Sequence, residues 1–70
     1  MQKVAAHVTG TVAKVEKRPG DKVAAGEVLV VLESMKMEMM VEAAGAGTVR
    51  EVRCQEGQSV AEGDVLVVIE

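Results

Sequence analysis

The stretch that organises this chain is Val28-Leu29-Val30-Val31-Leu32-Glu33-Ser34-Met35-Lys36-Met37-Glu38-Met39-Met40-Val41. Its first part is rich in β-branched residues and its last part alternates in polarity, so we expect two strands that meet around Met35-Lys36. Two-residue hairpin turns favour Asn-Gly, Asp-Gly or Gly-X, because their backbone needs positive φ. Met-Lys departs from that preference, although glycine occupies the other turns. A local departure inside a consistent sequence is a candidate for function.

The segments on either side of this turn are two copies of one pattern, offset by 37 residues. Between ranges 4–33 and 41–70, 15 of 30 aligned positions are identical, which chance does not explain. The longest identical runs are Gly10-Thr11-Val12 with Gly47-Thr48-Val49, Val23-Ala24 with Val60-Ala61, and Val28-Leu29-Val30-Val31 with Val65-Leu66-Val67-Val68. Each copy reads as strand, strand, short strand, strand, with glycine turns at Gly20 and Gly26 and their equivalents Gly57 and Gly63.

Neither copy could bury its apolar face alone, so we predict one all-β domain over residues 1–70. Repeat one occupies 4–33, the hairpin tip 34–37 and repeat two 41–70. Two four-stranded antiparallel units packed face to face around a pseudo-two-fold axis would form a flattened barrel or sandwich. The same symmetry predicts that the chain termini are neighbours, at the end of the domain far from Lys36.

The alternation of apolar residues along the strands predicts the core. Its expected members are Val4, Ala6, Val8, Val12, Val23, Val28, Val30, Leu32, Val41, Val49, Val60, Val65, Val67 and Ile69, with Val15 and Val52 as possible additions. By parity Leu29, Val31, Leu66 and Val68 lie on the opposite strand face. The sequence leaves open whether these four are covered or partly exposed.

Composition excludes several classes of function. The net charge is −3 and the chain has no aromatic residue to stack on bases, so nucleic-acid binding is not expected. The longest apolar run, Val28 to Leu32, is far shorter than the roughly 20 residues of a membrane span, and we expect no membrane association. A single cysteine, Cys54, permits no internal disulfide and no Cys/His metal cluster. This fits a cytoplasmic setting.

A lysine at a turn is ordinarily only a solvated charge, and methionines are ordinarily core fillers. We expect at least one of Met37, Met39 and Met40 to face inward. Lys36, however, holds the unique position between the repeats, and a residue at the turn itself, such as Met35, cannot be buried by parity. No other residue has the partners that a catalytic group needs. We expect His7 to be an ordinary residue of the first strand and Cys54 an inert side chain of the sixth.

The hexapeptide Glu33-Ser34-Met35-Lys36-Met37-Glu38 resembles the Glu-Ala-Met-Lys-Met-Glu signature of biotinyl domains, the biotin carboxyl carrier family. The similarity extends over nearly the whole chain, through the Gly-Thr-Val and Pro-Gly-Asp turns to the closing Val-Leu-Val-Val-Ile-Glu. Ser34 replaces the commoner alanine, and His7-Val8-Thr9 stands where many relatives have a Pro-Met-Pro segment. No insertion between Val12 and Val23 corresponds to the protruding thumb of some carriers, so the chain resembles the short thumbless type.

The resemblance implies that biotin protein ligase joins biotin to the ε-amine of Lys36, with Met35 and Met37 as flanking residues. It also implies that Glu33, Ser34 and Glu38 contribute to recognition. The attached biotin would carry a carboxyl group from a biotin carboxylase site to a carboxyltransferase site, which acts on an acyl-CoA or similar acceptor. The domain would be a carrier, not an enzyme, with no catalytic and no metal-binding residues of its own.

Two alternatives belong to related folds. A lipoyl carrier of a 2-oxo acid dehydrogenase complex shares the duplicated β fold and a hairpin lysine, and Glu33 is compatible with it, but such domains resemble Asp-Lys-Ala at the tip. A purely structural barrel, as in membrane-fusion adaptor proteins, carries a long helical insertion between its halves. Only the tip joins the halves here.

Overall fold

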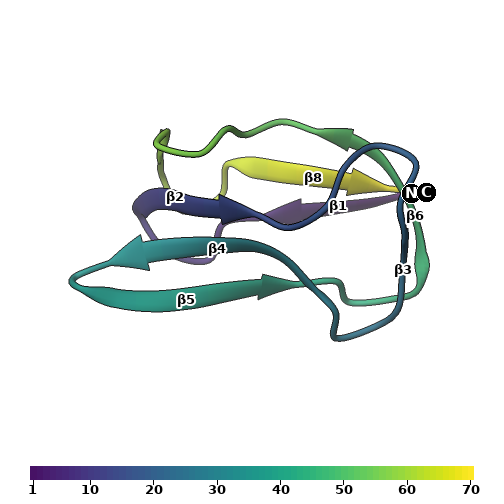
Figure 1. The fold of residues 1–70 in the computed structure, drawn as a ribbon, viewed down its shortest axis with the longest axis horizontal. Coiled ribbons are helices and arrows are strands. Elements are labelled where there is room, and N and C mark those ends of the chain that lie inside the picture. The colour runs from purple at the N-terminus through teal and green to yellow at the C-terminus, as the bar shows by residue number, and fades with distance from the viewer.

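A computed structural model describes residues 1–70 as eight β-strands without a helix (Figure 1). The strands are β1 (Gln2–Ala5), β2 (Gly10–Val15), β3 (Lys22–Val23), β4 (Val28–Ser34), β5 (Met37–Glu42), β6 (Gly47–Val52), β7 (Ser59–Val60) and β8 (Val65–Ile69). Each repeat contributes two longer strands, a two-residue strand and a longer strand, as its sequence predicts.

The strands form two four-stranded antiparallel sheets, with the orders β1-β8-β6-β3 and β5-β4-β2-β7. The β1–β8 pairing is repeated in the β5–β4 pairing when 37 is added to the β1 numbers and subtracted from the β8 numbers. Val4 pairs with Val67 as Val41 pairs with Val30. The pseudo-two-fold axis therefore exchanges the sheets. The prediction of two four-stranded antiparallel sheets is confirmed, and each sheet takes two strands from each repeat. Each repeat therefore needs strands of the other to complete either sheet.

The core lies between the two sheets and contains no buried polar or charged residue. Most of its predicted members are buried, and Val4, Val8, Val15 and Val52 pack against it while partly exposed. Val28 and Val65 are only half-buried, contrary to the prediction, because each is the first residue of its strand. The sequence left open whether four residues of the opposite strand face are covered, and all four are buried: Leu29, Val31, Leu66 and Val68.

Irregular pairing explains why adjacent residues can share the core. The β4–β5 register shifts between Val28 and Val30, and the β2–β4 register shifts between Val12 and Lys14, as expected for β-bulges. A bulge adds one residue to a strand and so breaks the period of two on which parity depends. Leu29 and Val30 are both fully buried for this reason.

Two sequence assignments outside the strands need correction. His7 is exposed in the bend after β1, not within that strand, and Cys54 lies beyond the end of β6. Cys54 is nevertheless buried in the core, where burial raises the pKa of its thiol. Its expected inertness is consistent with that burial, because the thiolate is the reactive form.

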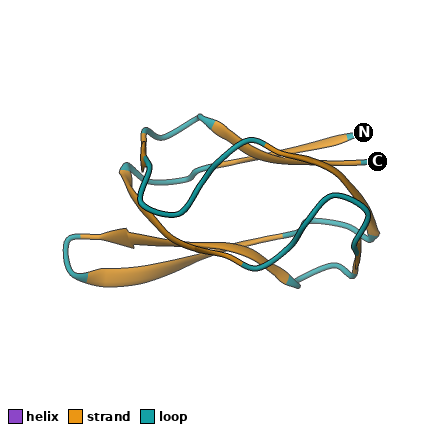
Figure 2. Cartoon of the chain, turned by 45° about the horizontal axis from the view of Figure 1, so that its top comes forward, coloured by secondary structure: helices purple, strands orange, loops and turns teal.

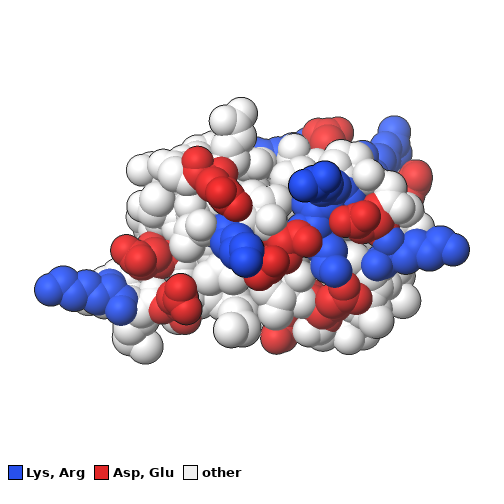
Figure 3. All heavy atoms as spheres, in the orientation of Figure 1, with Lys and Arg blue, Asp and Glu red and all other residues white.

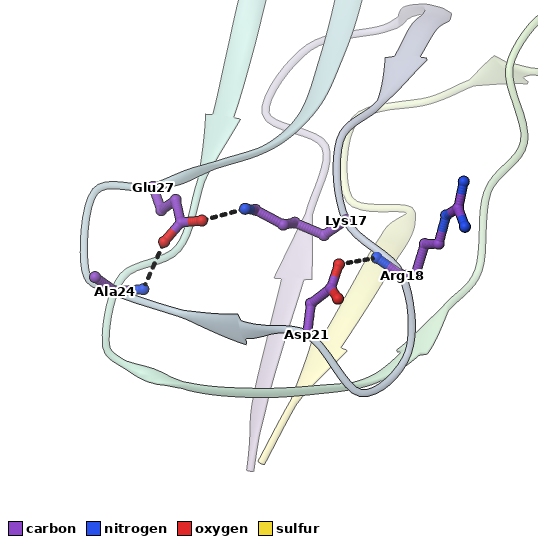
Figure 4. Close-up of polar contacts among 5 residues, drawn as sticks. All are labelled: Lys17, Arg18, Asp21, Ala24 and Glu27. Atoms are coloured by element: carbon purple, nitrogen blue, oxygen red, sulfur yellow. Dashed lines mark hydrogen bonds and ion pairs between the residues drawn. The ribbon is translucent and has the colours of Figure 1, made fainter.

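The connections between strands are held by side chains that cap turns. The Asp21 carboxylate accepts a hydrogen bond from the N–H of Arg18 at 2.8 Å, and the Glu27 carboxylate accepts one from the N–H of Ala24 at 2.9 Å (Figure 4). Glu27 also pairs with the ammonium of Lys17, which ties the loop after β2 to the turn before β4. Gly20, within the first of these turns, has a φ of 96°, a conformation that glycine adopts without steric cost.

The two ends of the chain lie side by side, at the end of the domain opposite the β4–β5 turn (Figures 1 and 2). Gln2 pairs with Ile69, and Glu70 exchanges two backbone hydrogen bonds with Thr48. The predicted position of the termini is confirmed. None of the described elements is a helix long and apolar enough to cross a membrane.

Candidate functional site: the β4–β5 hairpin tip

The β4–β5 hairpin extends beyond the body of the domain and closes with a two-residue turn (Figure 2). Ser34 and Met37 form the last strand pair, and Met35 and Lys36 occupy the turn with φ values of 53° and 64°. Positive φ at both central residues is the type I′ arrangement of tight hairpins. For residues other than glycine this conformation costs about 1–2 kcal/mol each. Met35 and Lys36 are the only such residues in the chain.

Lys36 is exposed and its amine has no partner. The ion pairs of the structure join Lys14 to Glu16, Lys17 to Glu27 and Arg53 to Glu51, and none includes Lys36. One basic side chain projects past the end of the domain that holds this turn, with acidic side chains behind it (Figure 3). An amine in this position is open to approach by another protein from most directions.

Methionines surround this amine without being buried. Met35 is 92 % exposed and Met37 is 63 % exposed, whereas Met39 packs against the core. The sequence predicted that at least one of Met37, Met39 and Met40 faces inward, and Met39 fulfils that role. The tip therefore presents two flexible thioether side chains beside the lysine, a surface that adapts readily to an apolar pocket.

The recognition residues proposed from the sequence lie at the base of the turn. Glu33 and Glu38 face each other directly across β4 and β5. Ser34 donates a hydrogen bond from its hydroxyl to the carbonyl oxygen of Thr9, at 2.9 Å. The Thr9 hydroxyl in turn accepts a hydrogen bond from the N–H of Glu62, at 3.3 Å. The hairpin is thus connected to the loop before β2 and to the turn before β8.

Sequence reasoning missed Thr9 and Gly10 as supports of the tip. A Cβ at Gly10 would lie 2.5 Å from the carbonyl oxygen of Glu33, so only glycine allows β2 to approach the end of β4 this closely. The repetition of Gly10 as Gly47 was a usable signal, because Gly47 makes the equivalent approach to Glu70.

Neither a metal-binding cluster nor the cavity of the domain lies at the tip. The described residues contain no group of three His, Cys, Asp or Glu side chains arranged to hold a metal ion. A cavity of about 430 Å³ lies at the turns of the second repeat, where Arg53, Gln58, Asp64 and Leu66 are among its lining residues. None of its lining residues belongs to the hairpin tip. The exposed amine of Lys36 is therefore the reactive group that the hairpin tip offers.

Comparison with known proteins agrees with this geometry. Residues 1–69 match the family model described as "Biotin-requiring enzyme". Over 35 residues the chain is 51 % identical to glutaconyl-CoA decarboxylase subunit gamma of Acidaminococcus fermentans, which is half of this chain and 24 % of that protein. The chain thus spans about a quarter of the length of that relative.

Solved structures extend the likeness to three dimensions. A single-chain, multi-domain long-chain acyl-CoA carboxylase superposes with a TM-score of 0.89 at 38 % identity, over 94 % of this chain and 7 % of that one. Urea carboxylase of Kluyveromyces lactis gives a TM-score of 0.93 at 33 % identity, over 99 % and 6 %. The lipoyl domain of the 2-oxoglutarate dehydrogenase complex of Azotobacter vinelandii gives 0.77 at 29 %, over 96 % and 95 %.

The family match covers nearly the full length and agrees with the duplicated two-sheet fold and the exposed lysine. The two carboxylases are more similar to this chain than the lipoyl domain is, both in TM-score and in sequence identity. The chain belongs to the family of biotin-requiring enzymes, and its cofactor is covalently bound biotin.

Proposed function

We propose that this domain is a biotin carboxyl carrier and that Lys36 is its attachment residue. The observation that carries the proposal is the Met35-Lys36 turn. Its two residues adopt a costly backbone conformation and leave an unpartnered amine at the tip of a projecting hairpin. An amide bond to biotin needs an accessible primary amine that no carboxylate holds. Lys36 meets that requirement.

Attachment is the work of a biotin protein ligase, which we propose as the first partner. The Lys36 amine attacks the carbonyl carbon of an activated biotin carboxyl group, an amide bond forms and the activating group leaves. A lysine amine is mostly protonated at neutral pH, so the ligase must accept its proton. Glu33, Ser34 and Glu38 would supply the recognition, because they fix the base of the turn and border it with negative charge.

When bound, biotin supplies a ureido nitrogen that accepts and releases a carboxyl group. The protein's contribution is mechanical: a rigid two-sheet body, a braced hairpin and a flexible lysine stem. We propose a biotin carboxylase and a carboxyltransferase as the enzymes that act on the arm, in the cytoplasm, with an acyl-CoA or similar acceptor. The acyl-CoA and urea named in the two carboxylases are the acceptor classes to test, and the glutaconyl-CoA named in the decarboxylase would instead be a carboxyl donor.

A lipoyl carrier is the second candidate, because the fold of this chain also superposes on a lipoyl domain. The residues of the tip favour the biotin carrier. Met35 and Met37 flank Lys36 on both sides, whereas the lipoyl domains have a different signature, and both carboxylases superpose more closely.

Intact mass spectrometry followed by peptide mapping tests the proposal. The chain is produced with a biotin protein ligase and biotin, and separately with a lipoate ligase and lipoate. We expect one biotin per chain, on Lys36, and none on Lys3, Lys14, Lys17 or Lys22. Lys36→Arg, which keeps the charge, should remain unmodified. Biotin on another lysine would refute the assignment of the site, and lipoate in place of biotin would favour the second candidate.

A further inference from the structure

An exposed methionine lies on the outer face of β5, beyond the two at the turn. Met40 is 57 % exposed and is paired across the strands with Val31 of β4. Glu38 and Glu42 lie two residues before and after it, so all three share one face of the strand. Glu33 faces Glu38 from β4. We call these four residues, Glu33, Glu38, Met40 and Glu42, the β5 outer face.

The internal symmetry shows that packing does not require a methionine here. The equivalent of Met40 in the other sheet is Lys3 of β1, which pairs with Val68 as Met40 pairs with Val31. Both strands are at the edge of their sheets. An exposed lysine is the usual way to prevent a sheet edge from associating with other chains. β1 has that lysine, and β5, which begins at the tip, has a thioether in its place.

The charges around Met40 point to the kind of surface that would cover it. Like charges that face each other across a strand pair destabilise that pair. Glu33 and Glu38 face each other in this way, and neither belongs to an ion pair. Glu42 is also absent from the ion pairs. A partner with lysine or arginine side chains around an apolar pocket would remove this repulsion and bury Met40 in the same contact.

We propose that the β5 outer face is a docking surface for the biotin carboxylase, a partner that itself rests on the proposed function. The biotin carboxylase must hold ATP and bicarbonate, both anions, and so needs basic side chains around its active site. Met40 is three residues from Met37, or about 10 Å along the strand. A contact at Met40 therefore sets the position from which the arm enters the carboxylase.

The test is the affinity of the unbiotinylated carrier for its cognate biotin carboxylase, measured by titration calorimetry. Met40→Lys introduces the residue that occupies the equivalent position, Lys3, in the other sheet. Lys3→Met, the reverse change at that position, is the matched control. We expect Met40→Lys to raise Kd about tenfold or more and Lys3→Met to leave it unchanged. Met40→Ser, which adds no charge, should raise Kd by a smaller factor. The wild-type Kd should rise with salt, and Glu38→Gln with Glu42→Gln should weaken that dependence.

Melting temperatures and biotin loading show whether the Met40→Lys variant is folded and modified. Met40→Lys should melt close to the wild type and take up one biotin on Lys36. An unchanged Kd for a folded, fully loaded Met40→Lys would overturn the docking surface and leave the carrier function intact. A loss confined to the ligase or to the carboxyltransferase would also overturn it. Absence of biotin from the wild type would instead contradict the proposed function.

Discussion

The backbone of Gly10 lies against Glu33 so closely that a Cβ on Gly10 would stand 2.5 Å from the Glu33 carbonyl oxygen. Gly47 has the same relationship to Glu70 in the other sheet. We therefore expect Gly10→Ala and Gly47→Ala to destabilise the domain by similar amounts, about 1–3 kcal/mol, because each overpacks a strand pair. Thermal unfolding followed by far-UV circular dichroism measures this, since the chain has no aromatic chromophore.

The same two variants should differ in function. Gly10→Ala displaces the end of β4 that leads into the turn, whereas Gly47→Ala acts at the opposite end of the domain. At a temperature well below both midpoints, the rate of Lys36 biotinylation should fall several-fold in Gly10→Ala only. Equal rates in the two variants would show that the ligase does not depend on the position of the hairpin base.

Gly20 and Gly57 test the symmetry of the scaffold without a packing effect. Their φ values are 96° and 88°, and a Cβ at either would meet nothing within 4 Å. Replacement by valine should cost about 1–3 kcal/mol at each site, from backbone conformation alone. Calorimetric melting of Gly20→Val and Gly57→Val should show similar losses. Strongly unequal losses would contradict the equivalence of the two turns.

The backbone conformation of the Met35-Lys36 turn should lower the stability of the domain. Met35→Asn places a residue that tolerates positive φ in the first position of a type I′ turn, and should stabilise the domain by about 0.5–1 kcal/mol. For a domain of this size, 1 kcal/mol corresponds to a rise in Tm of about 4–8 °C. Differential scanning calorimetry measures it. A fall in Tm would mean that the Met35 side chain stabilises the turn through contacts despite its exposure.

The methionines of the tip should matter after biotinylation more than during it. Met35→Ala and Met37→Ala keep the backbone of the hairpin, so loading of Lys36 should remain close to that of the wild type. Carboxyl transfer by the loaded carriers should fall about tenfold to hundredfold, because burying a Met side chain contributes about 1.5–3 kcal/mol. Steady-state transfer with the cognate enzymes measures it. Wild-type transfer in both variants would exclude a docking role, and lost loading would assign the methionines to the ligase.

The Lys17–Glu27 pair should make stability depend on pH. The hydrogen-bonded contact with Lys17 lowers the pKa of Glu27 below its usual 4.5, and the same contact raises the pKa of Lys17 above 10.5. A lowered carboxyl pKa gives stability that is present above pH 4.5 and is lost as the pH falls through the folded-state pKa. The Lys17 contribution is present below pH 10.5 and is lost as the pH rises through its folded-state pKa.

Melting from pH 3 to 7 tests this in Lys17→Met. The wild type should exceed the variant in Tm at neutral pH, and the difference should shrink in acid. Lys14→Met is a suitable control, because the Lys14–Glu16 pair is longer, at 3.9 Å, and the Lys14 side chain is 64 % exposed. A difference that persists unchanged in acid would assign the effect to the apolar stem of Lys17.

The sequence was informative where the structure is periodic or repeated. The 37-residue repeat predicted the eight strands, the turn glycines and the neighbouring termini, and the hexapeptide around Lys36 predicted the tip. Parity could not place Leu29 or Leu66, because the pairing register shifts at each of them, so that each is buried together with the residue that follows it. No local pattern announces such a bulge.

The supports of the tip were also beyond local reasoning. The bond from Ser34 to Thr9 joins residues 25 positions apart, and the bond from Glu62 to Thr9 joins residues 53 apart. Such contacts follow from the order of strands in the sheets. The repeat alone did not reveal that order, since it is equally compatible with two separate sheets or with two shared ones.

Because the termini are neighbours, the backbone of the domain almost closes on itself. Glu70 and Met1 occupy, by the 37-residue offset, the places that Glu33 and Glu38 occupy at the hairpin, where the segment Ser34-Met35-Lys36-Met37 closes the gap. The same four residues inserted between Glu70 and Met1 would close the backbone into a circle with a second turn opposite the first. Cutting that circle at the original turn would move the displayed lysine to the other sheet.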